Sequence, residues 1–340
     1  MTRQPFVVGL IAGVAAVVGG YQLIRSRHRI DFTGRLVVIT GGSRGLGLVL
    51  ARQFATQGAR VCLLARDEEE LDRAAAQVAQ SGAAGVETYV CDVRSQADVE
   101  RVITEILFRH SGIDVLVNNA GAIQVGPLEH MKVADFENAM ATHFWGPLYS
   151  MQACLPAMKR RGFGRIVNIA SIGGRIAVPH LAPYSASKFA LVGLSDAFRA
   201  EVAQFGVHVT TVSPGLMRTG SPINAEFKGQ HDQEFAWFAI ADAIPGMSIG
   251  AERAARQIVD ACRHGDPELT ISVPAKAAVL ASALAPTVFA ELMAAVVRCL
   301  PASTGASGDR PERGKDTRSP WAPSAVTTLS DRAAVGNNEM

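Results

Sequence analysis

The pattern of apolar and polar positions changes near residue 34 of the chain. From there on, short apolar runs alternate with longer segments that have the spacing of amphipathic helices. The apolar runs predict strands at 35–40, 61–64, 86–90, 113–117, 165–170, 207–212 and 269–273. Longer helices are predicted at 95–110, 132–160 and 183–205. Strands that alternate with helices in this way indicate an α/β domain with a parallel sheet and right-handed crossovers, here over residues 30–275.

A long uncharged stretch precedes this domain. No charged residue lies between Arg3 and Arg25, and residues 6–24 are apolar apart from glycines and a terminal Tyr-Gln pair. At 1.5 Å per residue the stretch spans about the ~30 Å hydrocarbon core, so it predicts an N-terminal transmembrane helix. Arg25, Arg27 and Arg29 follow at once. The positive-inside bias then predicts a single-pass anchor, residues 1–29 with their basic flank, and a domain that faces the cytoplasm. A cleaved signal peptide is the alternative, because small residues are available for cleavage.

Two segments follow the predicted domain. Between residues 276 and 300 large apolar residues recur every four positions, which predicts an amphipathic helical segment bent at Pro286. We expect it to pack on the protein body, with the membrane surface as the alternative. Residues 301–340 are rich in Ser, Gly, Pro, Arg and Asp. A segment of this composition buries little apolar surface, so we predict a disordered, low-complexity C-terminal tail.

Charge and cysteine usage narrow the functional classes. The 340 residues carry a net charge of +2, from 33 basic and 31 acidic side chains, which gives no reason to expect nucleic acid as a partner. The five cysteines lie far apart and form no Cys-x-x-Cys pair. We interpret them as small core residues and expect no metal site.

A glycine-rich turn follows the first predicted strand. Gly41, Gly45 and Gly47 lie between strand 35–40 and a helix that runs to about Gln57. In such a turn the backbone N–H groups can approach a pyrophosphate, and the helix dipole favours its negative charge. The strand, turn and helix together predict a dinucleotide site.

The end of the second strand bears on which dinucleotide binds. An NAD enzyme usually places a carboxylate there to hold the ribose 2′-hydroxyl, whereas this chain has Ala65. Arg66 beside it and Arg44 in the glycine turn are suited to clamp a 2′-phosphate. We therefore predict NADP(H) as the cofactor; the alternative for Arg66 is an ordinary solvated surface charge.

Tyr184 and Lys188 are four residues apart on a predicted helix and so share one face. A free phenol titrates near ~10, and a neighbouring ammonium favours the phenolate. Tyr184 would thereby become a general acid or base at neutral pH. Ser171 follows the apolar run 165–170, where its hydroxyl could donate a hydrogen bond to a substrate oxygen.

Five motifs in a fixed order now resemble one family. They are Thr40-Gly41-x3-Gly45-x-Gly47, Asn118-Asn119-Ala120-Gly121, Ser171, Tyr184-x3-Lys188 and Ser213-Pro214-Gly215. Over about residues 34–275 the chain is similar to the short-chain dehydrogenases/reductases. The resemblance implies a Rossmann-type doubly wound parallel sheet in a single domain, hydride transfer with NAD(P)(H), and a catalytic Ser171, Tyr184 and Lys188.

The resemblance also implies a set of coenzyme contacts. In the family the Pro-Gly turn with Thr219 contacts the nicotinamide, and we expect Lys188 to hold the nicotinamide ribose. Asp92, at the end of the third predicted strand, could meet the adenine. The cofactor-binding residues that we expect are Gly41, Ser43, Arg44, Gly45, Leu46, Gly47, Arg66, Asp92, Val93, Asn119, Ala120, Gly121, Tyr184, Lys188, Pro214, Gly215 and Thr219.

One position departs from the family pattern. Where the family usually has an asparagine that holds a water in a proton relay to the lysine, this chain has His143. Histidine can also hold a water or relay a proton, so we expect His143 to take part in catalysis. The alternative is that it packs or caps a bend in its helix.

The predicted cover of the active site and two long helices indicate the class of substrate and the assembly. Residues 216–249, which the resemblance places over the substrate, contain many large apolar side chains and suggest a hydrophobic lipid, steroid, retinoid or acyl carbonyl/alcohol substrate. The alternative is that these side chains fill the core or touch a membrane. By analogy, helices 132–160 and 183–205 would form a homodimer or homotetramer interface. Rival functions are a non-catalytic, nucleotide-binding membrane scaffold and an enzyme that acts on a sugar nucleotide.

Overall fold

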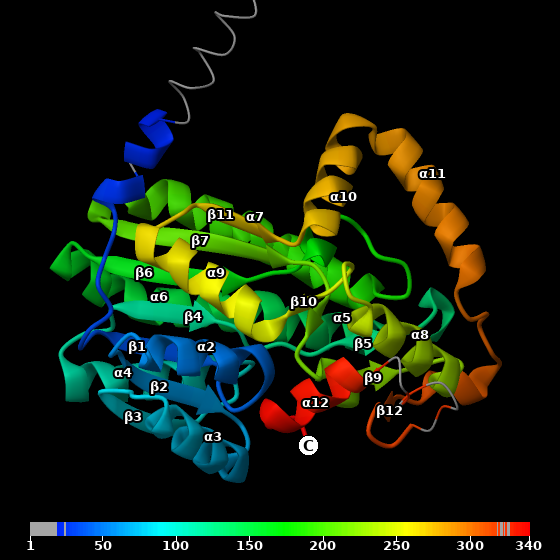
Figure 1. Ribbon diagram of the computed structural model, residues 1–340, viewed down its shortest axis with the longest axis horizontal. Helices are drawn as coiled ribbons and strands as arrows, with labels where there is room; N and C mark the ends of the chain where they lie inside the picture. Colours follow the sequence, from blue (N-terminus) through cyan, green and yellow to red (C-terminus); the bar gives the residue numbers. More distant parts are fainter. Residues whose placement is uncertain (1–18, 24, 318, 320–321, 323, 325–326) are drawn as a thin grey trace, which may run out of the picture.

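A seven-stranded parallel sheet forms the centre of the molecule (Figure 1). The computed structural model describes residues 19–23, 25–317, 319, 322, 324 and 327–340. The strand order is β11-β7-β6-β4-β1-β2-β3. The strands are β1 Leu36–Thr40, β2 Arg60–Ala65, β3 Gly85–Val90, β4 Val115–Asn118, β6 Gly164–Ile169, β7 Val207–Pro214 and β11 Glu268–Ile271. The predicted doubly wound sheet is confirmed, and its order reverses between β1 and β4, where ligands bind in such folds.

Helices cover both faces of the sheet. One face carries α2 (Gly45–Ala55), α3 (Glu68–Gln80) and α9 (Ala251–His264), and their apolar side chains join the first core cluster. The other face carries α4 (Gln96–His110), α6 (Gly146–Arg161) and α7 (Ala182–Val202), which contribute to the second cluster. All five residues of β1 are buried because both faces of the strand are covered, which explains its unbroken apolar run.

The predicted helix at 132–160 is interrupted. It consists of α5 (Val133–Met140), a π-helical turn η2 (Ala141–Trp145) and α6. A π-helical turn inserts an extra residue and rotates the side chains that follow, and such turns are often found at functional sites. Here it contains His143, which is fully buried.

Smaller elements lie beyond the carboxyl ends of the strands. One of them is helix α8 (His231–Ala243), which contributes Phe235 and Phe238 to a third apolar cluster. The other short elements there are β5 Gln124–Val125, η1 Leu128–His130, η3 Ile172–Gly174, β8 Met217–Arg218, η5 Ser221–Ile223, β9 Glu226–Phe227 and β10 Ile249–Gly250, whereas η4 Ala203–Phe205 directly precedes β7 at its amino end. Most of the large aromatic side chains of the expected substrate cover thus pack into the core, which was the alternative interpretation.

The segment after β11 forms two helices that stand away from the body (Figure 1). They are α10 (Val273–Leu284) and α11 (Pro286–Val296), followed by η6 (Val297–Cys299). Pro286 begins the second helix, so the bend lies where it was predicted. No residue of α11 is buried, however, and its apolar side chains do not pack on the protein body as expected.

The C-terminal segment is ordered, so the prediction of a disordered tail is wrong for its described residues. It contains η7 (Ala306–Asp309), β12 (Glu312–Arg313) and α12 (Thr328–Gly336). Strand β12 pairs antiparallel with β9, and α12 packs on α8. The segment is ordered despite its polar composition because it is held largely by specific hydrogen bonds rather than by a large apolar surface of its own.

The predicted transmembrane helix at residues 6–24 lies largely outside the described residues. Within the described part of the chain, no helix is both long and apolar enough to cross a bilayer. The basic flank is partly described: Arg25 forms ion pairs with Asp260 of α9 and with Asp266. These pairs join the flank to the body at the end of α9.

Candidate active site

The structure brings Ser171, Tyr184 and Lys188 together at the end of β6. Ser171 begins the turn η3, and its Oγ accepts a hydrogen bond from the N–H of Gly173 at 3.0 Å. The Nζ of Lys188 donates to the carbonyl of Ile169, the last residue of β6, at 2.8 Å. It lies 5.6 Å from the centre of the Tyr184 ring. The tyrosine and the lysine thus share a helix face, as their spacing predicted.

Burial controls the protonation of this group. It raises the pKa of Tyr184, and a hydrogen bond with Ser171 acts in the opposite direction. Burial also lowers the pKa of Lys188 to about 7. From the sequence we expected the ammonium to lower the pKa of the phenol. In the structure the larger effect on Tyr184 is its removal from water, which raises the pKa.

His143 is fully buried next to this group. Its Nε2 accepts a hydrogen bond from the N–H of Ala122 at 3.1 Å, and its Nδ1 lies 2.8 Å from the Oγ of Ser187. That Oγ donates in turn to the carbonyl of Tyr184 at 2.8 Å. Burial and the charge of Lys188 hold the pKa of His143 well below its usual value. Both nitrogens of a neutral ring therefore have protein partners, and this geometry favours the packing interpretation over a water-holding relay.

The Asn118–Gly121 motif ties β1 to β4. The side chain of Asn119 donates to the carbonyls of Thr40 and Gly41, and its backbone N–H donates to the Thr40 hydroxyl. Asn118 donates to Asn168 at 2.8 Å, and Asn168 donates to Ser195 of α7. This buried network steadies the strand ends that carry the site.

The glycine turn is packed too closely for side chains at two of its positions. A Cβ at Gly47 would lie 2.0 Å from the carbonyl oxygen of Gly41, and a Cβ at Gly41 would lie 2.7 Å from the Cα of Ala120. Leu46 is buried and belongs to the core rather than to the surface of the turn. The turn leads directly into α2, so its backbone can face an anion at the helix N-terminus.

The two arginines expected to hold a 2′-phosphate differ in their surroundings. Arg44 forms an ion pair with Glu70 at 2.8 Å, and the Oγ of Ser43 donates to the same carboxylate at 2.9 Å. Arg66 follows the end of β2 at Ala65 and is exposed. Glu70 was not anticipated, and it is a competitor that a phosphate would have to displace from Arg44.

The other expected coenzyme contacts lie along the same edge of the sheet. Asp92 follows β3 and pairs with Arg94, which lowers the pKa of the Asp92 carboxyl. Val93 is buried behind it. Pro214 ends β7, and the N–H of Gly215 donates to the carbonyl of Ile271 at 3.1 Å.

Residues from the end of the chain lie within this edge, which the sequence reasoning missed. The N–H of Gly45 donates to the carbonyl of Asn337 at 2.8 Å, and the Asn337 side chain donates to the carbonyl of Thr219 at 3.2 Å. Asn338 donates to the carbonyl of Ser43 at 2.9 Å. No periodicity or motif in the polar tail indicated these contacts.

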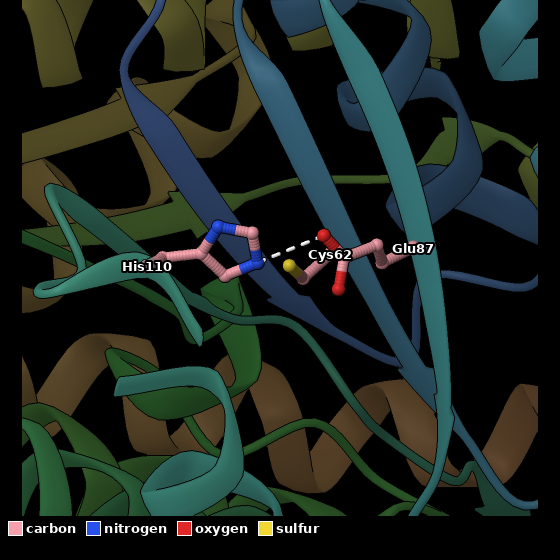
Figure 2. Close-up of side chains that lie close together, drawn as sticks. All are labelled: Cys62, Glu87 and His110. Atoms are coloured by element: carbon pink, nitrogen blue, oxygen red, sulfur yellow. Dashed lines mark ion pairs between the residues drawn. The ribbon is translucent and has the colours of Figure 1, made fainter. Parts of the chain in front are cut away.

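A second polar cluster lies away from this site, between β2, β3 and the end of α4 (Figure 2). Cys62, Glu87 and His110 hold potential metal ligands within 4.8 Å of one another. Glu87 is already 2.8 Å from the Nε2 of His110 and accepts a hydrogen bond from Tyr89 at 2.7 Å. Burial raises the pKa of the Cys62 thiol to about 12, and Arg60 approaches the other nitrogen of His110 at 3.4 Å. A protonated thiol and a nearby guanidinium disfavour a bound cation, so we assign no metal here.

Comparisons with known proteins agree on one family. A model described as short chain dehydrogenase matches residues 35–228. Dehydrogenase/reductase SDR family member 7B of Danio rerio is 38% identical over 222 residues, which cover 64% of this chain and 72% of the relative. The crystal structure of a short-chain dehydrogenase from Streptomyces avermitilis is 30% identical with a TM-score of 0.67, over 79% of this chain and 99% of that one. A metagenomic short-chain oxidoreductase in complex with NADP is 30% identical with a TM-score of 0.58, over 72% and 98% of the two chains.

Proposed function

The chain belongs to the short-chain dehydrogenase/reductase family and is an oxidoreductase of that family. From this premise we propose that it interconverts a carbonyl and an alcohol, with Tyr184 as general acid and base. The observation that carries the proposal is the convergence of Ser171, Tyr184 and Lys188 at the end of β6, on the edge that also holds the glycine turn. A binding protein has no use for a tyrosine and a lysine buried together in this way.

Each of the three side chains has a distinct task in the reductive direction. The family's nicotinamide coenzyme supplies the hydride when it is bound. Tyr184 gives its hydroxyl proton to the substrate oxygen, and the Ser171 hydroxyl donates a hydrogen bond to the same atom. Lys188, which the Ile169 carbonyl holds in place, stabilises the phenolate that remains. Because the pKa of Lys188 is lowered to about 7, Lys188 loses its positive charge as the pH rises through neutrality. Turnover should therefore fall in this range, since that charge stabilises the Tyr184 phenolate.

The residues of the glycine turn fit a dinucleotide. A side chain at Gly47 would meet backbone at 2.0 Å, and the turn opens onto the N-terminus of an 11-residue helix. The structure also places an anionic group there, the carboxylate of Glu339, whose Oε1 would lie 2.5 Å from a Cβ on Gly45. A carboxylate at this position is a stand-in for a phosphate and supports an anion site.

We propose that NADP(H) is preferred over NAD(H). Three observations support this: β2 ends in Ala65 without a carboxylate, Arg66 beside it is exposed, and Arg44 lies in the turn. A similar solved enzyme was crystallised with NADP. Arg44 reaches a 2′-phosphate only if it exchanges its present partner Glu70.

The coenzyme proposal is tested by paired substitutions. Arg44→Ala with Arg66→Ala should weaken NADPH binding by about a hundredfold or more and leave NADH binding nearly unchanged, because two charge-assisted contacts are lost and each costs ~1.5–3 kcal/mol. Glu70→Gln should instead strengthen NADPH binding by freeing Arg44. Arg101→Ala, an exposed arginine on α4, is the matched control. Equal losses for NADPH and NADH would refute the phosphate clamp.

We propose a hydrophobic carbonyl substrate of the lipid, steroid, retinoid or acyl class. Tyr184 packs against the third apolar cluster, as do the partly buried side chains of Ile123, Val178 and Trp237. An apolar wall beside the reacting hydroxyl favours an apolar substrate. The test is a screen of lipid, steroid, retinal and β-ketoacyl carbonyls with the detergent-solubilised protein, following NADPH absorbance. Turnover confined to small polar carbonyls would overturn this assignment, and firm NADPH binding without any turnover would favour a scaffold.

We propose that residues 1–29 attach the enzyme to a membrane, with the catalytic domain on the cytoplasmic side. The uncharged stretch at 6–24 supports this, and so do the exposed apolar side chains of α10 and α11, among them Leu284 at 77% and Val288 at 70% exposure. Deletion of residues 1–24 should release the protein from the carbonate-washed membrane fraction, or leave it only loosely bound through α10 and α11. Full retention after the deletion and after Leu284→Ser with Val288→Ser would remove both elements from the attachment.

We further propose that α6 and α7 pair with a second copy of the chain. Trp145 before α6 and Phe189 on α7 remain 44% exposed, which suits a contact surface. Phe189→Glu should shift the mass measured by light scattering toward the monomer, and an unchanged mass would place the interface elsewhere.

A further inference from the structure

The last residues of the chain dock onto the edge of the sheet that carries the coenzyme site. Helix α12 brings them there: Ala334 is fully buried, and Ser330 donates a hydrogen bond to Asp242 of α8 at 3.1 Å. Gly220, with φ of +92°, allows this approach, because a Cβ there would lie 2.4 Å from the Cα of Ala334. Figure 1 shows α12 beyond the carboxyl ends of the strands, next to the chain end marked C.

Asn337 is bonded to the glycine turn, to α2 and to Thr219. Its carbonyl accepts the N–H of Gly45 at 2.8 Å, and its side-chain amide donates to the carbonyl of Thr219 at 3.2 Å. Arg52 of α2 donates to its side-chain oxygen at 2.8 Å. A residue bonded to both the glycine turn and Thr219 lies across the path that a dinucleotide would follow.

Asn338 continues these contacts along the glycine turn. Its amide donates to the carbonyls of Ser43 and Glu70, at 2.9 and 3.2 Å, and its side-chain oxygen accepts from Arg73 at 3.0 Å. Its φ of +59° is a conformation that asparagine adopts more readily than most residues. The Asn338 side chain is thus bonded both to the glycine turn and to α3.

Glu339 places a carboxylate at the N-terminus of α2. It is only 8% exposed, and its Oε2 lies 3.5 Å from the Nε of Arg44. The side chain of Asn224 donates to Oε2 at 2.7 Å and to the Glu339 carbonyl at 2.8 Å. Glycine at position 45 is what leaves room for this group. The carboxylate therefore takes the place that favours a phosphate, on the helix dipole and beside an arginine.

We propose that residues 337–339, held by α12, are a built-in competitive inhibitor that the coenzyme must displace from the glycine turn. This inference rests on the proposed function in one respect, namely that the dinucleotide binds at this turn. The docked segment and the pyrophosphate of a dinucleotide would share the N–H of Gly45, and Glu339 would compete with the 2′-phosphate of NADPH for the guanidinium of Arg44, so both cannot be bound at once. The apparent coenzyme affinity is then reduced by the fraction of molecules in which the segment is docked. Saturating coenzyme would restore full turnover, because the inhibition is competitive.

The test compares NADPH dissociation constants, by tryptophan fluorescence or calorimetry, in three proteins: the full chain, a chain truncated after Gly336, and the full chain with Asn337→Ala and Glu339→Gln. The second variant keeps α12 in place, so it separates loss of the inhibitor from any misfolding of the truncated chain. Both variants should bind NADPH about tenfold more tightly and show a lower KM for NADPH with unchanged kcat. Val335→Ala, at a position 67% exposed on α12, is the matched control and should behave as the full chain.

Two further measurements identify the mechanism. A synthetic peptide of residues 328–340 should inhibit a chain truncated after Thr327, which also lacks α12, competitively against NADPH. Hydrogen exchange of residues 330–339 in the full chain should rise when NADPH is added. Equal or weaker NADPH binding by both variants, with the full chain still binding NADPH, would overturn the inhibitor proposal alone. Failure of all three proteins to bind NADPH or NADH would overturn the nucleotide site and the inhibitor together.

Discussion

The catalytic group and the glycine turn lie on the same edge of the sheet but depend on very different parts of the chain. Lys188 is held by Ile169, 19 positions away, and Ser171 by its neighbour Gly173. The glycine turn is bonded to residues such as Asn338, which is 295 positions from Ser43. The first region is built from adjacent elements of the fold. The second takes its shape from a local glycine motif but is bonded to residues from a distant segment, so the motif predicts the shape of the turn and not what is bonded to it.

Removal of the Tyr184 hydroxyl should have the largest effect, and it should affect the catalytic group without affecting the glycine turn. Tyr184→Phe should lower turnover by about 10²–10⁴-fold, because the proton donor is lost, while the dissociation constant for NADPH stays the same. Steady-state rates and NADPH fluorescence titration measure the two quantities. Tyr149→Phe on α6 is the matched control, a half-buried tyrosine outside the group. A normal rate in Tyr184→Phe would show that the group is not catalytic.

A side chain in the glycine turn should have the next largest effect. Gly47→Ala forces a Cβ to within 2.0 Å of the Gly41 oxygen, so the turn must shift. We expect a loss of about 1–3 kcal/mol in the free energy of unfolding and coenzyme binding weakened by tenfold or more. Thermal melts and NADPH titration check this. In the control Gly193→Ala the new Cβ meets nothing within 4 Å, and a helix-favouring residue should leave stability equal or higher. Full NADPH binding by Gly47→Ala would contradict the close-packed turn.

A substitution of His143 tests whether this residue belongs to the catalytic group or only packs beside it. His143→Asn shortens the side chain and breaks at least one of the hydrogen bonds to Ala122 and Ser187, which should cost about 1–3 kcal/mol of stability. The pH profile of turnover should keep its shape, because a pKa held well below the usual value keeps this ring neutral throughout. A profile displaced in the variant, with stability unchanged, would instead identify His143 as a proton relay.

The smallest expected effect concerns pH and the docked C-terminal segment. Burial raises the pKa of Asp242 to about 7, opposed by the Ser330 hydroxyl, the Met217 N–H and the charge of Arg218. When α12 is docked, Asp242 thus holds its proton up to about pH 7, whereas a solvated aspartate loses it near ~4. The docked state binds more protons in this window, so docking weakens as the pH rises toward 7 and changes little above it.

Apparent NADPH affinity of the full chain should therefore improve a few-fold from pH 5 to 7, relative to the chain truncated after Gly336. Burial raises the pKa of Glu339 as well, which acts in the same direction. Asp242→Asn should reduce the improvement, and titrations of the two chains at pH 5, 6, 7 and 8 measure it. A pH dependence that is identical in the full, truncated and Asp242→Asn chains would exclude Asp242 from the coupling.

The sequence predicted what depends on neighbours and missed what depends on distant contacts. The five inner strands of the sheet were predicted because buried parallel strands are rich in apolar residues, and the partly exposed edge strands β3 and β11 were predicted from shorter patterns. The pairing of Tyr184 with Lys188 followed from helix geometry. The π-helical turn at His143 was not predicted, since an inserted residue leaves the apolar spacing almost unchanged. The docking of Asn337 and Glu339 could not be predicted from the sequence. It depends on single hydrogen bonds to distant residues, and such contacts leave no periodic pattern in the chain.

The α10–α11 pair is also the covalent link between the sheet and the C-terminal segment, and this gives it a role in proteolysis. Arg298, just after α11, is exposed and follows helices with little packing to protect them. A trypsin-like cut there would leave the catalytic fold intact but turn a tethered segment into a separate peptide held by contacts alone. Its local concentration would fall to that of the protein in solution, so dilution would lower the fraction of molecules in which the glycine turn is occupied.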